Sequence, residues 1–366
     1  MRSARSIKIL TIISLATLGV SAVSALAFGT VSASIQKIDA FAGLDDRPGK
    51  SSSAINYLIV GSDTREGLSK AELAELRVGS VKTAAGKRSD TMLLVHISKA
   101  RDKAAIISLP RDSFALIPEH KNAQGKLIPA KYSKINSAFN WGGAPLLIEV
   151  IENMTDLKID HYVEINFAGF ADVVDALGGI EVCTKKDIDD PKSHLVLPAG
   201  VHTLDGIEAL KFVRTREFDG LGDIGRMQRQ QQFISSVLRK ATSAGVLLNP
   251  ITMVNFINSS LSAVITDSGL QSSDLITLAK QMKSLSTTKV RTLTVPLSNL
   301  YYNSNGVTAS VLWDPVLAPE LWQRLKEDRA VIDEVTPSPS PSATTSSTPI
   351  IVDKFKSKTA ADDPCK

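Results

Sequence analysis

Twenty consecutive uncharged residues near the N-terminus constrain this chain more than any other feature. The run Ile9–Phe28 has about the length at which an α-helix crosses the hydrocarbon core of a bilayer. Arg2, Arg5 and Lys8 precede it, and basic residues on this side keep the N-terminus in the cytoplasm. We therefore expect a cell-membrane protein with a single pass, in which residues 1–8 are cytoplasmic, residues 9–28 form a transmembrane signal anchor and the rest is extracellular.

The same run leaves a second possibility open. Ala25-Leu26-Ala27 has the small-residue pattern at which signal peptides are cleaved, so the run could also direct export and then be removed. Either way, the working part lies outside the membrane. Without the three basic residues before the run, 39 of the 42 basic residues remain against 38 acidic ones. This balance excludes a nucleic-acid-binding protein, which needs a basic face.

Composition divides the exported chain into four parts. Residues 29–54 are polar and are expected to form a juxtamembrane stalk. Residues 55–245 have the patterns of a folded core domain, and residues 246–332 are expected to add helices and a strand to the same domain. The last part, 333–366, contains TPSPSPSATTSSTP, a Pro/Ser/Thr-rich composition that cannot bury a core and is expected to be disordered.

Apolar strand patterns and helical periods alternate through the folded region. The predicted strands are Tyr57–Val60, Thr91–Ile97, Ala104–Leu109, Tyr162–Ile165, Ile180–Cys183, Ala209–Val213 and Val290–Val295. The predicted helices are Gly142–Thr155, Phe167–Leu177, Arg226–Thr242 and Ile251–Ile265. The polar turn between the second and third strands indicates a hairpin. The expected fold class is therefore α/β (α+β), with a mixed central β-sheet flanked by helices.

Charged clusters stand beside the predicted strands, where α/β folds usually bind ligands. If the strand Ala209–Val213 continues, Arg214 and Arg216 point to the same side of the sheet, because side chains alternate along a strand. Arg226, Arg229 and Gln230 share one face of the helix that follows. Converging guanidinium groups bind phosphate oxygens, so a phosphate or pyrophosphate is the expected ligand. The alternative is a set of surface arginines paired with three nearby acidic residues, Glu217, Asp219 and Asp223.

Two aspartates at strand ends could hold a metal ion. Mg²⁺ usually takes one or two carboxylates and completes its shell with water and substrate phosphates, and Asp63 and Asp90 fit that requirement. The alternative is that each aspartate only caps a turn. The general base of any hydroxyl transfer also stays open among Asp63, Asp90 and Asp112.

Other motifs in the sequence give little evidence for a function. Gly220-Leu221-Gly222-Asp223-Ile224-Gly225 matches G-x-G-x-x-G, but the acidic ribose ligand expected about twenty residues later is missing. Asp187-Ile188-Asp189 resembles a D-x-D metal motif but lies in a polar loop. No G-x-S-x-G elbow and no zinc-ligand spacing occur. Cys183 and Cys365 could pair in an oxidising compartment, a question that the sequence leaves open.

Taken together, the motifs resemble the LytR-CpsA-Psr (LCP) family of membrane-anchored cell wall glycopolymer transferases. The resemblance covers about Ile55–Val237 and keeps the family's order. The matching stretches are YLIVGSDTREG, RSDTMLLVHIS, IISLPRDS, KINSAFNWGG, INFAGFADVVDALGGIEVC, LPAGVHTLDGIEALKFVRTR and GDIGRMQRQQQF. The spacer Glu66–Lys87 departs from the family pattern because it is long, which leaves the orientation of Asp63 open.

The resemblance implies a Mg²⁺-dependent phosphotransferase with a deep apolar pocket for a polyprenyl chain. Such an enzyme attaches a glycopolymer from a polyprenyl-pyrophosphate carrier to peptidoglycan. Its implied catalytic residues here are Asp63, Asp90 and Arg111, with Mg²⁺ on Asp63 and Asp90. The implied pyrophosphate clamp is Arg111, Arg214, Arg216 and Gln230, and further pocket candidates are Arg65, Arg88, Arg226 and Arg229. Two other functions remain open: a polyprenyl-pyrophosphate hydrolase and a non-catalytic polyprenyl-phosphate-binding envelope protein. The sequence does not identify the glycopolymer.

Overall fold

The computed structural model describes the chain from Gln36 onward, in several ranges. These are 36–65, 68–76, 89–122, 124–220, 222–243, 264–281, 285–335, 350–362 and 365. The expected anchor, the Pro/Ser/Thr-rich run 336–349 and most of the predicted helix Ile251–Ile265 therefore lie outside the described residues. Within the described ranges, no helix combines the length and the hydropathy needed to cross a bilayer.

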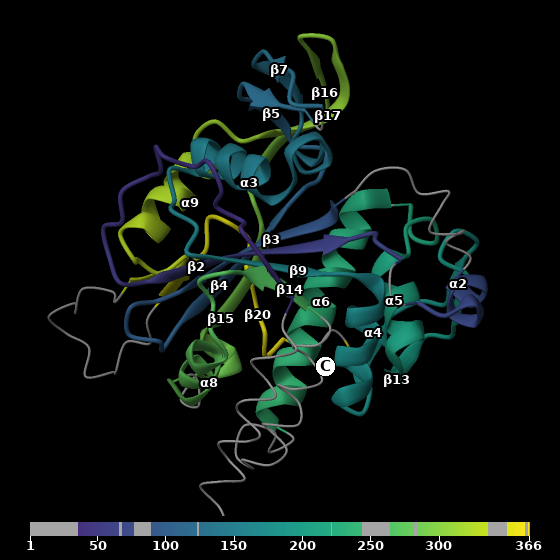
Figure 1. Cartoon of the computed structure of the whole chain (residues 1–366). Helices are drawn as coiled ribbons and strands as arrows, with labels where there is room; N and C mark the ends of the chain where they lie inside the picture. Colours follow the sequence, from purple (N-terminus) through teal and green to yellow (C-terminus); the bar gives the residue numbers. More distant parts are fainter. Residues whose placement is uncertain are drawn as a thin grey trace, which may run out of the picture.

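An eight-stranded mixed sheet forms the centre of the molecule, in the order β1-β14-β9-β2-β3-β4-β15-β20 (Figure 1). The strands are β1 (Gln36–Ile38), β2 (Ile55–Ser62), β3 (Ser89–Ile97), β4 (Ala104–Leu109), β9 (His161–Ile165), β14 (Val264–Asp267), β15 (Val290–Thr294) and β20 (Lys358–Thr359). The β3–β4 hairpin is antiparallel, as predicted, while β2 is parallel to β9 and β4 is parallel to β15. The carboxyl ends of β2, β4, β9 and β15 thus meet at one end of the sheet, here called the site end.

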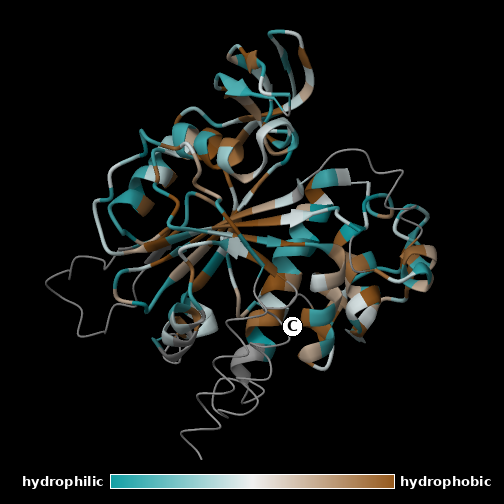
Figure 2. Cartoon of the chain, viewed as in Figure 1, coloured by the Kyte–Doolittle hydropathy of each residue, from teal (hydrophilic) through white to brown (hydrophobic). Residues whose placement is uncertain are grey.

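Helices cover both faces of this sheet, because its strands are apolar on both sides. Alternate residues of β2 enter different cores: Leu58 and Val60 pack with α3 (Ile135–Thr155) and α9 (Leu317–Lys326). Tyr57 and Ile59 face the other side, toward α6 (Gly222–Ser243) and α8 (Ser272–Gln281). Figure 2 shows the brown, apolar strands enclosed between these helices. The predicted mixed central sheet flanked by helices is confirmed.

The helix predicted at Gly142–Thr155 is present and starts earlier than expected. Within α3, Gly143 has a positive φ of 66° and interrupts the helical conformation. Pro145 follows two residues later, close to the position at which proline favours a new helical start. The later segment then buries Leu147, Ile148 and Ile151 completely in the core.

A smaller helical subdomain packs beside the sheet around a second core. Its elements are α2 (Lys70–Leu76), α4 (Phe167–Ala176), α5 (Gly206–Arg214) and the hairpins β10 (Ile180–Thr184) with β13 (Gly200–Leu204) and β11 (Ile188–Asp190) with β12 (Leu195–Leu197). The prediction of a strand at Ala209–Val213 is wrong, since these residues lie in α5. Asp205 and Glu208 form a capping box that starts this helix, and the apolar side chains after it follow a helical period.

Three hairpins project from the site end of the sheet and are here called the projecting lobe (Figure 1, top). They pair β5 (Phe114–Ile117) with β8 (Lys131–Lys134), β6 (His120–Lys121) with β7 (Leu127–Ile128), and β16 (Leu297–Ser304) with β17 (Val307–Trp313). The Trp313 indole donates a 2.8 Å hydrogen bond to the Ser113 hydroxyl, which ties the last hairpin to the first. The lobe thus joins segments that lie far apart in the sequence.

The expected stalk, 29–54, is not a free linker over its described part. β1 pairs with β14, Ala40 is completely buried, and the Arg47 guanidinium bonds both oxygens of the Glu152 carboxylate. These contacts could not be predicted from the polar composition, because only a few apolar residues of the segment, among them Ile38 and Phe41, pack against the core.

The prediction that the tail, 333–366, is disordered is wrong for the residues of the tail that the structure describes. β18 (Asp333–Val335) pairs with β19 (Ile350–Val352), and β20 joins the edge of the central sheet. Phe355 and Ala360 are buried, and Cys365 forms a disulfide with Cys183. The short 3-10 helix Thr287–Lys289 precedes β15, the neighbour of β20. The end of the chain therefore returns to the domain after the Pro/Ser/Thr-rich run.

Candidate functional site

A pocket of about 360 Å³ lies at the site end of the sheet. The end of β4 and the residues after it form one wall, and the first turns of α6 form another. Leu300 and Tyr301 of the projecting lobe close a third side. The charged residues that line it are Arg111, Asp112, Lys134, Asp223 and Arg226. Elements from three parts of the sequence thus converge on one charged cavity.

The carboxylate of Asp223 lies among three arginines. It is 3.3 Å from both Arg216 and Arg226 and 4.0 Å from Arg111, and its side chain is 44% exposed. Three guanidinium groups around one accessible carboxylate form an arrangement that a phosphate group can also satisfy. These contacts, together with the Arg229–Asp219 pair, match the alternative of arginines paired with nearby acidic residues, and Arg214 and Arg229 do not line the pocket. Binding of a phosphate here stays a prediction.

Arg226 is the most buried member of this group, with 4% of its surface exposed. Its Nε nitrogen is buried and has no hydrogen-bond partner among the described residues. A buried donor without an acceptor is costly, so a ligand oxygen at this point would be favourable. On the opposite wall, the side chains of Arg111 and Lys134 both approach Asp112, at 3.5 and 3.4 Å.

Four consecutive polar side chains of α6 bond four different parts of the molecule. The Arg229 guanidinium contacts Asp219 and the Thr215 carbonyl, and Gln230 donates to the Thr91 hydroxyl on β3 at 2.9 Å. The amide of Gln231 donates to Ser108 on β4 and Thr294 on β15, and Gln232 donates to the Cys183 carbonyl on β10. Side chains point about 100° apart round a helix, so this polar run fixes α6 from all sides.

The loop that carries Arg216 is held by a buried aspartate. The Asp190 carboxylate accepts hydrogen bonds from the backbone N–H groups of Lys192, Ser193, Arg216 and Glu217. Burial alone would raise the pKa of Asp190, but these four donors outweigh it and lower the pKa to about 2. The neighbouring Asp187-Ile188-Asp189 motif thus adjoins a structural carboxylate that positions the backbone of Arg216, whose side chain contacts Asp223 of the pocket.

The expected metal pair comes from neighbouring strand ends. Asp63 directly follows β2, and Asp90 is the extra residue of a β-bulge, because Gly61 pairs with Thr91 and Ser62 pairs with Ser89. Bulges often redirect a side chain beside a functional site. Among the described residues no group of three or more His, Cys, Asp or Glu could hold a metal. The Asp90 side chain lies outside the described part.

The remaining predicted residues fall into two groups. Asp63 and Arg65 lie half-buried after β2, and Arg214 ends α5 with its guanidinium over the Phe167 ring; none of these three lines the pocket. Arg214 differs from the expectation because its segment is a helix rather than a strand. Arg88 lies outside the described residues, as does the spacer 66–87 apart from residues 68–76, which contain α2. In the glycine motif 220–225, residues 222–225 are the first turn of α6, and the element before the motif is the helix α5 instead of a strand, which removes the basis for a dinucleotide site.

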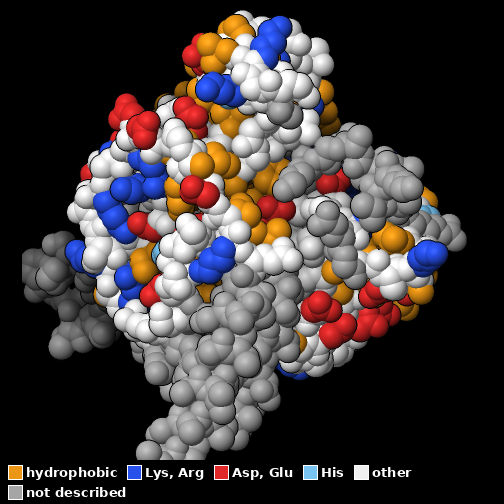
Figure 3. Space-filling model, in the orientation of Figure 1, with side chains coloured by type: hydrophobic (Ala, Val, Ile, Leu, Met, Phe, Trp, Pro, Cys, Tyr) orange, Lys and Arg blue, Asp and Glu red, His pale blue; other side chains and the backbone are white. Residues whose placement is uncertain are grey.

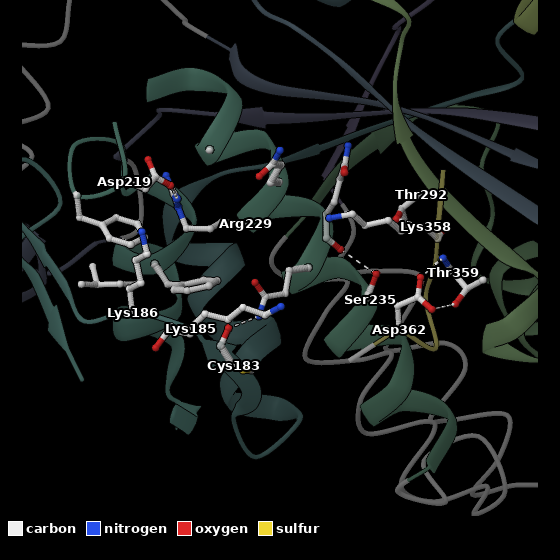
Figure 4. Close-up of a pocket in the computed structure, with 18 residues that line it drawn as sticks. Cys183, Lys185, Lys186, Asp219, Arg229, Ser235, Thr292, Lys358, Thr359 and Asp362 are labelled. Atoms are coloured by element: carbon white, nitrogen blue, oxygen red, sulfur yellow. Dashed lines mark hydrogen bonds and ion pairs between the residues drawn. The ribbon is translucent and has the colours of Figure 1, made fainter. Parts of the chain in front are cut away.

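A larger pocket, of about 640 Å³, lies along the opposite face of α6 (Figure 4). In Figure 4, Arg229 contacts Asp219 at one side of the pocket. The other side is formed by Lys358, Thr359 and Asp362 of the C-terminal segment. Ile188, Phe212 and Phe218 supply apolar wall. On the α6 side, Gln231, Gln232 and Ser235 border this pocket, whereas residues 145–154 of α3 lie largely in the main core.

Sequence reasoning missed Lys134, Leu300 and Tyr301 as pocket residues. Lys134 was visible only as the first residue of the KINSAFNWGG stretch, which suggested no chemistry by itself. Leu300 and Tyr301 stand in an uncharged hairpin far along the chain, where no local signal marks a site.

Comparison with known proteins identifies the family. The model of the LytR_cpsA_psr family matches residues 25–317, and the chain belongs to this family. The match confirms the resemblance seen in the motifs.

Relatives and a solved structure agree with this assignment. The chain is 35% identical over 271 residues to the probable cell wall biosynthesis protein LcpB of Corynebacterium glutamicum, covering 74% of this chain and 61% of LcpB. It is 36% identical over 202 residues to the polyisoprenyl-teichoic acid–peptidoglycan teichoic acid transferase TagT of Bacillus subtilis, covering 54% of this chain and 55% of that relative. The matched region therefore spans less than two thirds of both. The structure of TagT bound to LI-WTA superimposes with a TM-score of 0.55 at 28% identity, covering 75% of this chain and 90% of the other.

Proposed function

We propose that this LCP family member is a Mg²⁺-dependent transferase that attaches a glycopolymer from a polyprenyl-pyrophosphate carrier to peptidoglycan. One observation carries the proposal: three arginines surround the accessible Asp223 carboxylate in a pocket at the site end of the sheet. The named teichoic acid transferases among the relatives support the reaction class.

The arginines suit phosphoryl transfer because that reaction depends on positioning and charge neutralisation. A pyrophosphate that displaces Asp223 would receive donors from Arg111 and Arg226 on opposite walls, with Arg216 beside them. Because these groups are already fixed by the protein, little reorganisation is needed when negative charge moves to the leaving phosphate.

A magnesium ion would be held by Asp63 and Asp90. Their adjacent positions at the ends of β2 and β3 support this pair, since Mg²⁺ needs only one or two protein carboxylates. When bound, the ion would neutralise phosphate charge. The acceptor hydroxyl also needs a proton acceptor, and Asp112 on the pocket wall is the best-supported candidate because Lys134 and Arg111 hold it facing the cavity.

The carrier and the location complete the proposal. Ile188, Phe212 and Phe218 form an apolar part of the larger pocket along α6, and this part would contact a polyprenyl chain. The run Ile9–Phe28 would anchor the chain in the cell membrane, with the domain outside, where both carrier and peptidoglycan are accessible.

The test uses the full chain in lipid nanodiscs with a polyprenyl-pyrophosphate oligosaccharide, uncrosslinked glycan strands and Mg²⁺. Mass spectrometry of the glycan should find a sugar–phosphate adduct that EDTA abolishes. Arg111→Ala should lose the adduct, whereas Arg329→Ala, an exposed arginine away from the pocket, should keep it. Release of polyprenyl phosphate without an adduct would instead identify a hydrolase, and carrier binding without turnover would identify a binding protein.

A further inference from the structure

The projecting lobe concentrates exposed apolar side chains. Nine large hydrophobic side chains are exposed among the described residues, and five of them belong to the lobe. These five are Leu116 (49% exposed), Leu127 (52%), Tyr132 (43%), Leu300 (38%) and Tyr301 (79%). Such a concentration on one small element is unusual for a soluble surface and indicates a contact with another phase or partner.

The exposed residues stand on an ordered surface. Leu116 pairs directly with Tyr132 across β5 and β8, and the Phe114 ring stacks on Tyr132 at 4.9 Å. The Tyr302 ring of β16 meets the same Phe114 edge-on at 5.1 Å, which joins the β16–β17 hairpin to this face. On the other face of β5, Ala115 and Ile117 are buried in the core. The packing of Ala115 and Ile117 on the buried face of β5 therefore fixes the apolar residues of the other face in exposed positions.

The charge on the lobe is strongly one-sided. The segments 114–134 and 297–313 contain four lysines and a single acidic residue, Glu119. Lys121 and Lys126 are exposed beside Leu127, which pairs with Lys121 across β6 and β7, while the exposed Lys131 extends over the Trp141 ring. Figure 3 shows orange and blue side chains together at the tip of this lobe. Leucine and tyrosine next to lysine is the composition of surfaces that rest in the headgroup region of an anionic bilayer.

The chain enters the domain at the same end as the lobe. Gln36 of β1 pairs with Ile265, which lies opposite Glu164, and Glu164 lies opposite Val60 near the end of β2. The expected anchor ends at Phe28, so eight residue steps separate it from Gln36 and can span at most about 30 Å. With the expected anchor in the membrane, the site end of the sheet, from which the lobe projects, would lie within that distance of the bilayer.

We propose that the projecting lobe lies on the anionic surface of the membrane, beside the mouth of the candidate site. Leu300 and Tyr301 line the pocket as well, so the contact would bring that pocket to the headgroup level, where a lipid-linked pyrophosphate resides. In this respect the inference rests on the proposed function. A glycan strand fits the same surface less well, because the exposed leucines have no group that hydrogen-bonds sugar hydroxyls.

The experiment measures membrane contact without any donor or acceptor. The full chain with Tyr301→Cys, or in a second variant Leu127→Cys, is labelled with an environment-sensitive fluorophore in nanodiscs that contain phosphatidylglycerol and nitroxide-bearing lipid. The control is Ala100→Cys, an exposed residue in the β3–β4 turn at the opposite end of the sheet. We expect lipid quenching at 301 and 127 several times stronger than at 100.

Charge reversal tests the role of the lysines. Lys121→Glu with Lys126→Glu should shift the 301 label toward water, reducing the ratio of lipid-contacting to water-exposed label about fivefold per lysine. Lys99→Glu with Lys103→Glu, at the opposite end of the sheet, makes the same change in net charge and should have no effect.

Equal quenching at 301, 127 and 100 would overturn the proposal. The proposal would also be overturned if the label at 301 were not quenched by the nitroxide lipid and were shielded from water only when glycan strands are added. That result would make the lobe a binding surface for the glycan acceptor. Neither result would contradict the transferase, whose activity is measured separately.

Discussion

The side-chain amide of Gln230 donates a 2.9 Å hydrogen bond to the hydroxyl of Thr91 and so joins α6 to the start of β3. Thr91 directly follows Asp90, the bulged residue expected to hold metal. Gln230 was predicted from the sequence to clamp the pyrophosphate. Gln230 lines the pocket, which is compatible with that role, and its bond to Thr91 adds a positioning role for the strand that carries Asp90.

Thr91→Val tests the positioning role because it removes the hydroxyl while keeping the shape. We expect a loss of about 1 kcal/mol from one hydrogen bond, equivalent to about a fivefold lower kcat/KM. In a double-mutant cycle, Gln230→Leu and Thr91→Val should be strongly non-additive, and the apparent Mg²⁺ affinity should fall in both. Additive effects would show that Gln230 acts only on the substrate.

Asp223→Asn is expected to tighten the binding of inorganic pyrophosphate two- to tenfold. The variant removes the carboxylate that competes for three arginines, and a partly exposed ion pair contributes up to about 1 kcal/mol. Calorimetric titration without divalent ions measures the effect. Glu217→Gln is a matched control, since its carboxylate is 40% exposed, pairs with Lys192 and lies one residue from Arg216. Equal tightening in both variants would reveal a general charge effect instead of a site.

Much of the pocket was predictable from local patterns. Arg111 and Asp112 follow a strongly apolar strand, and the spacing of Arg226 and Gln230 places both on one helix face. Arg214 was misplaced because the alternation of apolar residues before it suited a strand as well as a helix. The capping box of Asp205 and Glu208 was the signal that decides between them.

Other features depended on contacts between distant segments and left no local signal. The Pro/Ser/Thr-rich composition of 336–349 predicts a segment without a core, but it could not reveal that Phe355 and Ala360 pack into the domain after that run. The pocket position of Tyr301 likewise follows from the packing of β17 against β5 and β8, about 180 residues earlier in the chain. Pairing at such separation is set by tertiary structure alone.

Asp190→Asn should lower the free energy of unfolding at neutral pH by about 2 kcal/mol. The pKa of Asp190 is about 2 in the folded protein and 3.8 in the unfolded chain, so its ionised form stabilises the fold. That stabilisation is complete above about pH 4 and is lost as the pH falls toward 2. Urea unfolding should therefore show a gap between wild type and variant that closes in acid. Asp189→Asn, its exposed neighbour, should show no such gap, and a pH-independent gap would contradict the assignment.

Cys365→Ser should destabilise the domain by about 2–5 kcal/mol, because the Cys183–Cys365 disulfide closes a loop with a sequence separation of 182 residues. The C-terminal segment keeps other contacts: β20 pairs with β15 at two positions, and Arg239 bonds the carbonyls of Ala360 and Asp362. We therefore expect faster amide exchange at 358–362 with the fold retained. Cys183→Ser removes the same bond and is the matched variant, so its unfolding free energy should agree. Unchanged stability in both variants would show that the tail is held by these contacts alone.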